Sequence, residues 1–442
     1  MVPGFFAGAE ELHRRFGRLS WSSLFGPAIW VADHGVPVGP VLFVGVQEAQ
    51  AAIQRSPTAA RVLLKPNRQP YAFGELFRQP DLAATLSEIA VLGTDYVYSG
   101  RWARHFSEMA RASGADINAD DLRSYRAAWM PPLRVQHGEF EVLALPPPNA
   151  GGGDILSALK LVEASHVAAA PPASASADTL FSLVQTSRLQ RILAFTPPAS
   201  LAASLPNVDL SPASRLRIET AEALVSRMHA PDWLETSREL LHKTVTTSHT
   251  AAVIAVDSRG NIAVVLHSCN CYGWGTAALF VDGVSIPEVA GATPAAQPIR
   301  RGARLPDFSA PILVLRQQRA ALAAAATGSS LPELMLQNVV DILDWGMDPH
   351  EALQQPHYYG PSYEPDERRP GVLALDREVV HEGEFLPAIL DGLSRRGQPL
   401  SVIPRVRSMA TAGVWIGVRI DTSPRRLIGA VPAAFRAHLE GF

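Results

Sequence analysis

Two strand-like apolar runs that flank a glycine-containing turn place the strongest constraint on how this chain folds. Residues 250–256 (TAAVIAV) and 262–266 (IAVVL) have the length and the β-branched content of strands. Between them, residues 257–261 (DSRGN) are rich in turn-forming side chains. The pattern predicts a β-hairpin with a short, glycine-ended loop.

The turn also fixes the expected register of this hairpin. If Asp257 faces Asn261 across a three-residue loop, Thr250 lies opposite Ser268, and two hydroxyl groups meet across the ladder. Side chains alternate along a strand, so Ser268 and Asn270 are expected on one face. A slip of one residue would turn every side chain to the other face.

A threonine hydroxyl is a poor nucleophile until a base removes its proton, and a threonine at a chain terminus has such a base in its own α-amine. Thr250 fits this chemistry if the chain is cut directly before it. Ser268 would then hold the nucleophilic hydroxyl by a hydrogen bond, and Asn270 would orient a substrate amide or carboxylate.

Composition narrows the classes of partner. Hydrophobic residues make up 47% of the chain and charged residues 18%, so most of it can bury a core. A net charge of -3 provides no field that attracts nucleic acid. No apolar run approaches the roughly 20 residues of a membrane span, and residues 1–11 contain no export signal. We therefore expect neither a nucleic-acid partner nor a membrane.

Cys269 and Cys271 lie on one face of the extended strand and point the same way, so no disulfide is expected between them. With His267 they lack the spacing of a zinc site. We expect no metal and no cofactor.

Further elements are predicted from apolar periodicity, capping residues and alternation. Helices are expected over residues 10–16, 22–34, 79–92, 116–125, 155–163, 213–229 and 331–345, a half-buried hairpin over 131–145 and a strand over 413–421. Residues 168–177 (AAAPPASASA) have little apolar bulk and are expected to form a solvated loop.

Several short motifs follow one another in a recognisable order along nearly the whole chain. Around the hairpin they are Thr250, Asp257, Arg259-Gly260-Asn261 and Ser268-x-Asn270. Elsewhere they are Val2-Pro3-Gly4, Gly17-x-Leu19-x-Trp21, Pro27-Ala28, Gly35-x-Pro37-Val38, Gln79-Pro80-Asp81-Leu82-Ala83, Tyr98-x-Gly100, Asp121-Leu122-x-x-Tyr125, Pro146-Pro147-Pro148-Asn149-Ala150-Gly151-Gly152 and residues 337–347 (QNVVDILDWGM). In this order the motifs resemble the γ-glutamyltranspeptidase family of N-terminal-nucleophile hydrolases.

This resemblance implies an α+β fold, a four-layer αββα sandwich with the nucleophile at a strand end. It also implies a self-cleaving enzyme in which residues 1–249 form a large-subunit-like region and residues 250–442 a small-subunit-like region headed by Thr250. The two parts would remain each other's partners in one composite fold. The implied activity is γ-glutamyl hydrolysis or transfer, on glutathione-like or other amides, through an acyl-enzyme. Family members are commonly periplasmic or extracellular.

Aligned with the family, Thr327-Gly328 falls on the oxyanion hole, whose donors are backbone N–H groups. The lid that binds the substrate α-amino group falls on residues 281–288, where Asp282 or Glu288 is the available acid. The paired serines that bind the α-carboxylate fall on Pro306-Asp307. An acidic side chain at this position disfavours a bound carboxylate, whereas the serines favour it.

Alternatives remain open at this level. Thr247 competes with Thr250 because residues 247–249 (TSH) resemble the family's Thr-x-His start, although that choice inserts three residues before Asp257. The family's segment upstream of Val2-Pro3-Gly4, with its carboxylate-binding arginine, precedes the point where this sequence begins. With the altered lid, this leaves a degenerate, non-catalytic relative as one alternative, and Asp307 leaves an acylase for amides other than γ-glutamyl ones as another.

Overall fold

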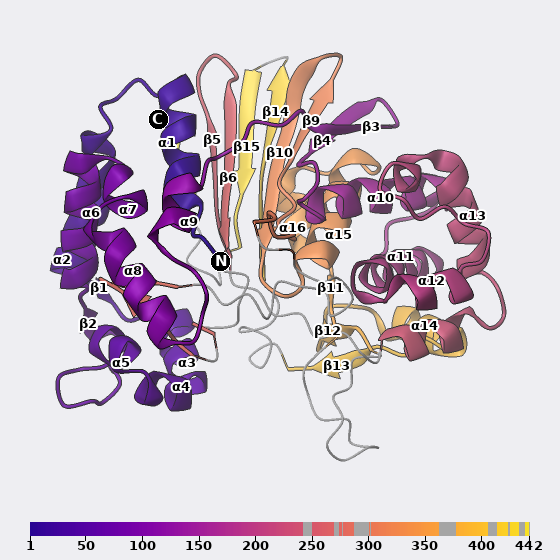
Figure 1. The fold of residues 1–442 in the computed structure, drawn as a ribbon. Helices are drawn as coiled ribbons and strands as arrows, with labels where there is room; N and C mark the ends of the chain where they lie inside the picture. Colours follow the sequence, from indigo (N-terminus) through magenta and orange to yellow (C-terminus); the bar gives the residue numbers. More distant parts are fainter. Residues whose placement is uncertain are drawn as a thin grey trace. The chain divides into compact units, whose positions relative to one another are not determined.

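The computed structural model describes residues 1–241, 250–268, 274–275, 277–286, 300, 302–361, 377–404, 413–422, 425–432 and 438–441. The chain divides into two compact units, Met1–Met130 with Cys269–Gly291, and Pro131–Ser268 with Ala292–Phe442 (Figure 1). Each unit has its own hydrophobic clusters. Along the described ranges, no helix has both the length and the apolar character needed to cross a bilayer.

The first unit is mainly helical. Its elements are α1 (Phe5–Phe16), α2 (Gly26–His34), α3 (Pro40–Glu48), α4 (Gln50–Arg55), α5 (Pro57–Leu63), α6 (Pro80–Leu92), α7 (Asp95–Tyr98), α8 (Arg101–Ala112) and α9 (Ala119–Ser124), with the strand pairs β1 (Val36–Pro37) and β2 (Leu76–Phe77), and β7 (Phe280–Val281) and β8 (Val284–Ser285). Helix α6 shows why the boundaries fall where they do. It begins with Pro80 and Asp81 in its first turn and ends at Leu92, because Gly93, whose φ is 69°, turns the chain away from the helix.

The second unit is built on a six-stranded antiparallel sheet of order β15-β14-β10-β9-β4-β3. Its strands are β3 (Leu133–His137), β4 (Phe140–Ala144), β9 (Ile312–Arg316), β10 (Arg319–Thr327), β14 (Val414–Thr422) and β15 (Arg425–Ala430). The remaining elements are α10 (Gly151–Ala164), α11 (Ala177–Phe195), α12 (Pro198–Ser204), α13 (Ile218–Met228), α14 (Trp233–Leu241), α15 (Leu331–Leu343), α16 (Pro349–Gln354), α17 (Pro387–Arg395), β5 (Thr250–Val256), β6 (Ile262–Ser268), β11 (Tyr358–Tyr359), β12 (Val379–His381) and β13 (Ser401–Ile403).

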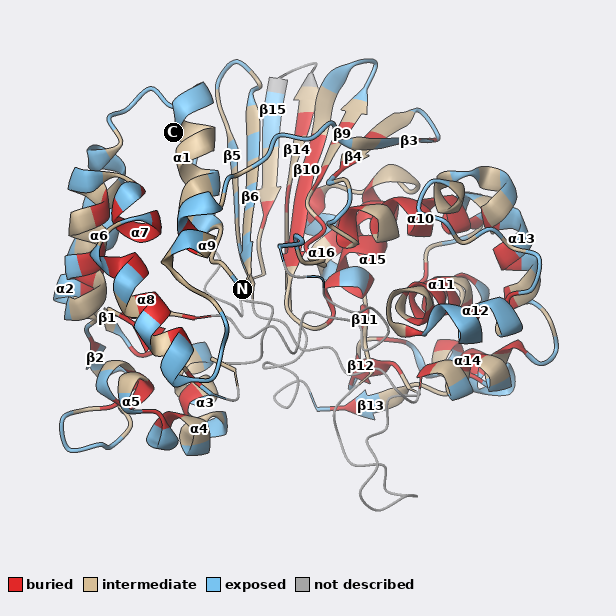
Figure 2. Cartoon of the chain, viewed as in Figure 1, coloured by how far each residue is buried: buried red, intermediate tan, exposed pale blue. Residues whose placement is uncertain are grey.

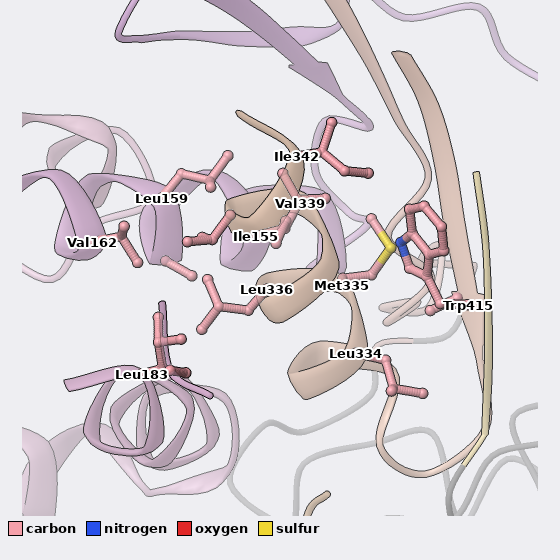
Figure 3. Close-up of a cluster of buried hydrophobic side chains, with 14 of the residues drawn as sticks. Ile155, Leu159, Val162, Leu183, Leu334, Met335, Leu336, Val339, Ile342 and Trp415 are labelled. Atoms are coloured by element: carbon pink, nitrogen blue, oxygen red, sulfur yellow. The ribbon is translucent and has the colours of Figure 1, made fainter. Parts of the chain in front are cut away.

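Helix α15 forms the centre of the core in this unit. It packs on β10 and β14 on one side and on α10 and α11 on the other. In Figure 3, Met335 points toward Trp415 of the sheet, while Leu336 points toward the helices. Both sides of α15 are buried, and four polar residues, Glu333, Gln337, Asn338 and Asp341, are buried together with the apolar ones.

The opposite side of β10 contacts the β5–β6 hairpin. Side chains alternate along β10, yet Ala323 through Ala326 are all fully buried, so both faces of the strand are covered. Alanine leaves little bulk on either face and lets the hairpin approach closely. Figure 2 shows that the hairpin is exposed or half-buried, whereas β10 is buried along much of its length.

The predicted mixed α+β class is confirmed, as are the hairpin of residues 250–268 and the helix that begins near Gln79. A loop occupies most of residues 168–177, as predicted, and Ala168, Ala169, Pro171 and Ala175 are exposed, but the segment is not solvated throughout. Ala173 is only 8% exposed within the main core, and the Trp345 Nε1 donates to the carbonyl oxygen of Ala170 at 3.0 Å. Small side chains pack there because large neighbours such as Trp345 supply the bulk.

Candidate active site

The turn of the β5–β6 hairpin is held by the side chain of Asp257. Its carboxylate accepts hydrogen bonds from the N–H groups of Arg259 and Asn261, at 2.8 and 2.9 Å, and from the Asn261 Nδ2 at 2.8 Å. These bonds, that of the Asn261 side chain foremost, lower the pKa of Asp257 to about 2. Gly260 closes the loop with a φ of 87°. This turn fixes the register of the two strands.

At the open end of the hairpin, Thr250 pairs with Ser268, which confirms the predicted register. The Thr250 Oγ1 donates to the Ser268 Oγ at 3.2 Å. Both residues lie on the half-buried face of the hairpin, whereas Ala251 and His267 are on its exposed face. The arrangement holds one hydroxyl by another at a strand end.

The backbone at Thr327-Gly328 ends β10 in a very close approach. Gly328 has a φ of 90°, and a Cβ there would lie 2.4 Å from the Cα of Gly413. A Cβ on Gly413 would lie 2.1 Å from the carbonyl oxygen of Thr327. Both positions therefore require glycine. Within the described part of the chain, the N–H of Gly328 has no hydrogen-bond acceptor, so it is available as a donor.

Gly413 is a residue that sequence reasoning missed. It precedes Val414, which pairs with Thr327 across the β10–β14 ladder. The signal is long-range, because only the strand register brings residue 413 beside residue 328. A single sequence contains no pattern that reveals such a glycine pair.

The two candidate sets lie at the same end of the layered strands. Figure 1 shows the turn of the β5–β6 hairpin and the turn between β9 and β10 at the same, upper end of the second unit. Since β5 begins at Thr250 and β10 finishes at Thr327, these two residues both lie at the opposite end. Strand β5 contacts β10, so the hydroxyl pair and the glycine turn belong to neighbouring strands.

Asp307 is engaged in local structure. Its carboxylate accepts from the N–H and the Oγ of Ser309, at 3.2 and 3.1 Å, and from the Asn149 Nδ2 at 3.3 Å. Its carbonyl oxygen accepts from the N–H of Ala150 at 2.7 Å. Asn149 also accepts from the N–H of Gly152 at 2.7 Å. Asp307 thus joins the turn before α10 to the strand segment that leads into β9.

Asp282 belongs to the first unit. Its Oδ2 lies 2.8 Å from the Nδ1 of His105, and its carbonyl oxygen accepts from the Thr85 Oγ1 at 2.7 Å. Its φ of 46° places it in the left-handed region that L residues rarely adopt. The predicted ligands Asn270 and Glu288 and the rival nucleophile Thr247 lie outside the described residues. Across the described ranges, no group of three or more His, Cys, Asp or Glu side chains is arranged to hold a metal.

Comparison with known proteins agrees with the resemblance seen in the sequence. The family model described as gamma-glutamyltranspeptidase matches residues 1–424. The acylase ACY 1 proenzyme of Pseudomonas sp. (strain SE83) is 27% identical over 421 residues, which are 92% of this chain and 69% of that protein. The glutathione hydrolase proenzyme of Bacillus subtilis (strain 168) is 32% identical over 162 residues, 37% of this chain and 27% of that protein.

Among solved structures, the cephalosporin acylase from Bacillus halodurans superposes with a TM-score of 0.75 at 19% identity. The match covers 99% of this chain and 78% of that one. This likeness shows a shared fold.

Proposed function

The chain belongs to the γ-glutamyltranspeptidase family of amide hydrolases and transferases, and on that premise we propose that it is a self-cleaving hydrolase whose nucleophile is the Thr250 hydroxyl. The observation that carries the proposal is the 3.2 Å hydrogen bond between Thr250 and Ser268 at the open end of a hairpin of defined register. The proenzyme names of two relatives support processing of the chain.

In this proposal, cleavage of the peptide bond before Thr250 frees its α-amine. The amine takes the proton of Oγ1 while that oxygen attacks the amide carbonyl of the substrate. The amine portion of the substrate leaves with the proton, and the acyl group remains on Thr250 as an ester. Water, or an acceptor amine, then releases the acyl group and restores the hydroxyl.

The backbone at Thr327-Gly328 would bind the oxygen that becomes negative during the attack. Backbone N–H donors serve this role well because they are fixed before the reaction begins. The steric lock between Gly328 and Gly413 supplies that rigidity. Ser268 positions the nucleophile, and Asn270 is proposed to orient the substrate.

Cleavage would produce two polypeptides that stay together in one fold. Residues 1–249 and 250–442 would remain associated as two subunits of one composite fold. The stacked helices, six-stranded sheet and hairpin of the second unit would be part of a four-layer αββα sandwich. The partners are a small amide substrate and the chain's own cleaved half.

Two classes of acyl group are candidates for the substrate: the γ-glutamyl group and other acyl groups. Asp282 or Glu288 would bind a substrate α-amine if the group is γ-glutamyl. Asp307 favours the second candidate, an acylase for other amides, because by the family resemblance it replaces a serine that binds the ligand carboxylate, and an acidic side chain would repel that group. One relative carries each kind of name, acylase and glutathione hydrolase.

A panel of three p-nitroanilides tests both the nucleophile and the preferred acyl group. The γ-glutamyl, glutaryl and butyryl compounds differ stepwise by loss of the α-amine and then of a carboxylate. We expect release of p-nitroaniline that Thr250→Ala abolishes, by more than about 10³-fold, and that Thr250→Ser retains in part. A marked preference for the γ-glutamyl compound would contradict the acylase candidate.

Thr247→Ala is the matched control, because it removes a threonine three residues away. It should leave turnover intact if Thr250 is the nucleophile. Turnover that survives Thr250→Ala but not Thr247→Ala would contradict the assignment. No turnover of any amide by the wild-type protein would favour the degenerate, non-catalytic alternative.

A further inference from the structure

A cavity of about 980 Å³ opens at the end of the six-stranded sheet that is remote from Thr327. It is lined by the turns that join the strands and by the residues that follow α15. Along β10, Arg319 in the cavity lining is eight residues from Thr327, or about 26 Å at roughly 3.3 Å per residue. Its volume is in the range of sites that hold small molecules.

Strand register gathers the arginines of this cavity on one face. Arg316 pairs with Phe140 on β4 and with Arg319 on β10, and directly paired residues share a face. A register shift between Ala320 and Leu322 then puts Leu322 on that face as well, opposite Arg419.

The same face continues across β14 and β15. Asp421 lies two residues after Arg419 on β14, and Arg426 is the residue opposite it on β15. This is the face on which α15 packs. Because α15 ends at Leu343 while the strands run on, the arginine-bearing end of the face is left open, and Trp345 lines it.

The charges of the cavity do not balance within it. Arg316 is paired with Glu139 at 2.8 Å and Arg419 with Asp421 at 3.1 Å. Asp344, the remaining acid of the lining, lies 2.8 Å from the Nε2 of His137.

Two cations are left over. Within the ranges that the structure describes, neither Arg319 nor Arg426 forms an ion pair. Both are exposed at the mouth of the cavity. Two guanidinium groups on adjoining parts of one face attract an anion with two charged ends.

The two-residue turn Gln317-Gln318 joins β9 to β10, and its φ values of 51° and 61° are those of a type I′ hairpin turn. One side chain of the lining is held rigidly. The Trp345 ring is fixed by its hydrogen bond to the Ala170 carbonyl oxygen, so it offers a rigid apolar wall.

We propose that this cavity binds a small polyanion, a di- or tricarboxylate or a diphosphate, with its charged ends on Arg319 and Arg426 and its body beside Trp345. The site is separate from the candidate active site and does not depend on the Thr250 chemistry. Arginine supplies two parallel donors to carboxylate and phosphate alike, so both classes share this recognition.

Titration calorimetry of the full chain with citrate and with inorganic pyrophosphate tests the proposal. We expect saturable binding of at least one probe, and the stronger one identifies carboxylate or phosphate as the preferred group. Acetate, with a single charge, should bind at least about tenfold more weakly. The double variant Arg319→Gln/Arg426→Gln should lower the affinity at least about tenfold, and Arg319→Lys/Arg426→Lys should lose less.

Arg104→Gln/Arg111→Gln, at two exposed positions of α8, is the matched control for the loss of two positive charges. It should leave the affinity unchanged, and thermal unfolding should show that every variant is folded. No saturable binding of either probe would overturn the proposal. So would equal affinity of Arg319→Gln/Arg426→Gln and the wild type, or an equal loss in Arg104→Gln/Arg111→Gln, which would indicate unspecific attraction.

Discussion

The β5–β6 hairpin and strand β10 lie against each other but are held in different ways. On the hairpin only one face is half-buried, and Val253 on the other is 63% exposed. On β10, Ala323 to Ala326 are completely buried between α15 and the hairpin. The candidate nucleophile is thus on an element maintained by its own ladder and turn, and the candidate oxyanion donors are on an element locked into the core.

From this contrast we expect some substitutions to lower both stability and activity, and others to lower activity alone. Substitutions in β10 and its ends should disturb both, because the strand is part of the core. Substitutions in the hairpin should disturb activity with little effect on the free energy of unfolding.

The largest effect is expected for Gly328→Ala. The new Cβ would lie 2.4 Å from the Cα of Gly413, and the φ of 90° is strained for alanine. We expect the free energy of unfolding to fall by about 3 kcal/mol or more, together with loss of turnover. Gly138→Ala, at a φ of 55° with no atom within 4 Å, isolates the backbone strain and should cost only about 1 kcal/mol in denaturant unfolding.

A second large effect is the pH dependence of stability that we expect from Asp341, a buried residue of helix α15. Burial, and then the nearby charge of Asp344, raises the pKa of Asp341 to about 8, from 3.8. The folded protein therefore keeps a proton that the unfolded chain loses above about pH 4. The free energy of unfolding should fall as pH rises from about 4 to about 8, by up to about 1.4 kcal/mol per pH unit, and then level off.

Asp341→Asn should remove that decline in urea unfolding measured at several pH values. Asp391→Asn, at an exposed position of α17, is the matched control and should retain it. An identical pH profile for Asp341→Asn and the wild type would contradict the assignment to Asp341.

The same Ala→Val substitution, made once in β10 and once in β5, compares how tightly the two strands are packed. Ala325→Val adds two methyl groups inside the packed layers and should cost about 1–3 kcal/mol. Ala255→Val adds the same groups on the exposed face of β5 and should change stability by less than about 0.5 kcal/mol. Similar costs at the two sites would mean that the hairpin is as tightly packed as β10.

The smallest effect is expected for Asp257→Ala in the hairpin turn. It removes three hydrogen bonds that fix the register of Thr250 against Ser268. We expect turnover to fall by less than about tenfold, through loss of alignment. Asp257→Asn keeps an acceptor oxygen for the N–H groups of Arg259 and Asn261 and should lie nearer to the wild type.

How far the sequence predicts this molecule depends on how local the determinants are. The hairpin register was predictable because five consecutive residues, 257–261, determine it. The Gly328–Gly413 contact was not, because it arises from pairing between strands 85 residues apart. The arginine-lined cavity has the same origin, since its charged residues come from several strands that only the sheet brings together. The packing of Ala173 was missed because the bulk comes from its neighbours.

Intact mass and N-terminal sequencing of the purified protein test the central claim most directly. The account predicts two polypeptides, the second beginning at Thr250, and a single uncut chain for Thr250→Ala. A new terminus at Thr247, or an uncut chain that still hydrolyses amides, would contradict it.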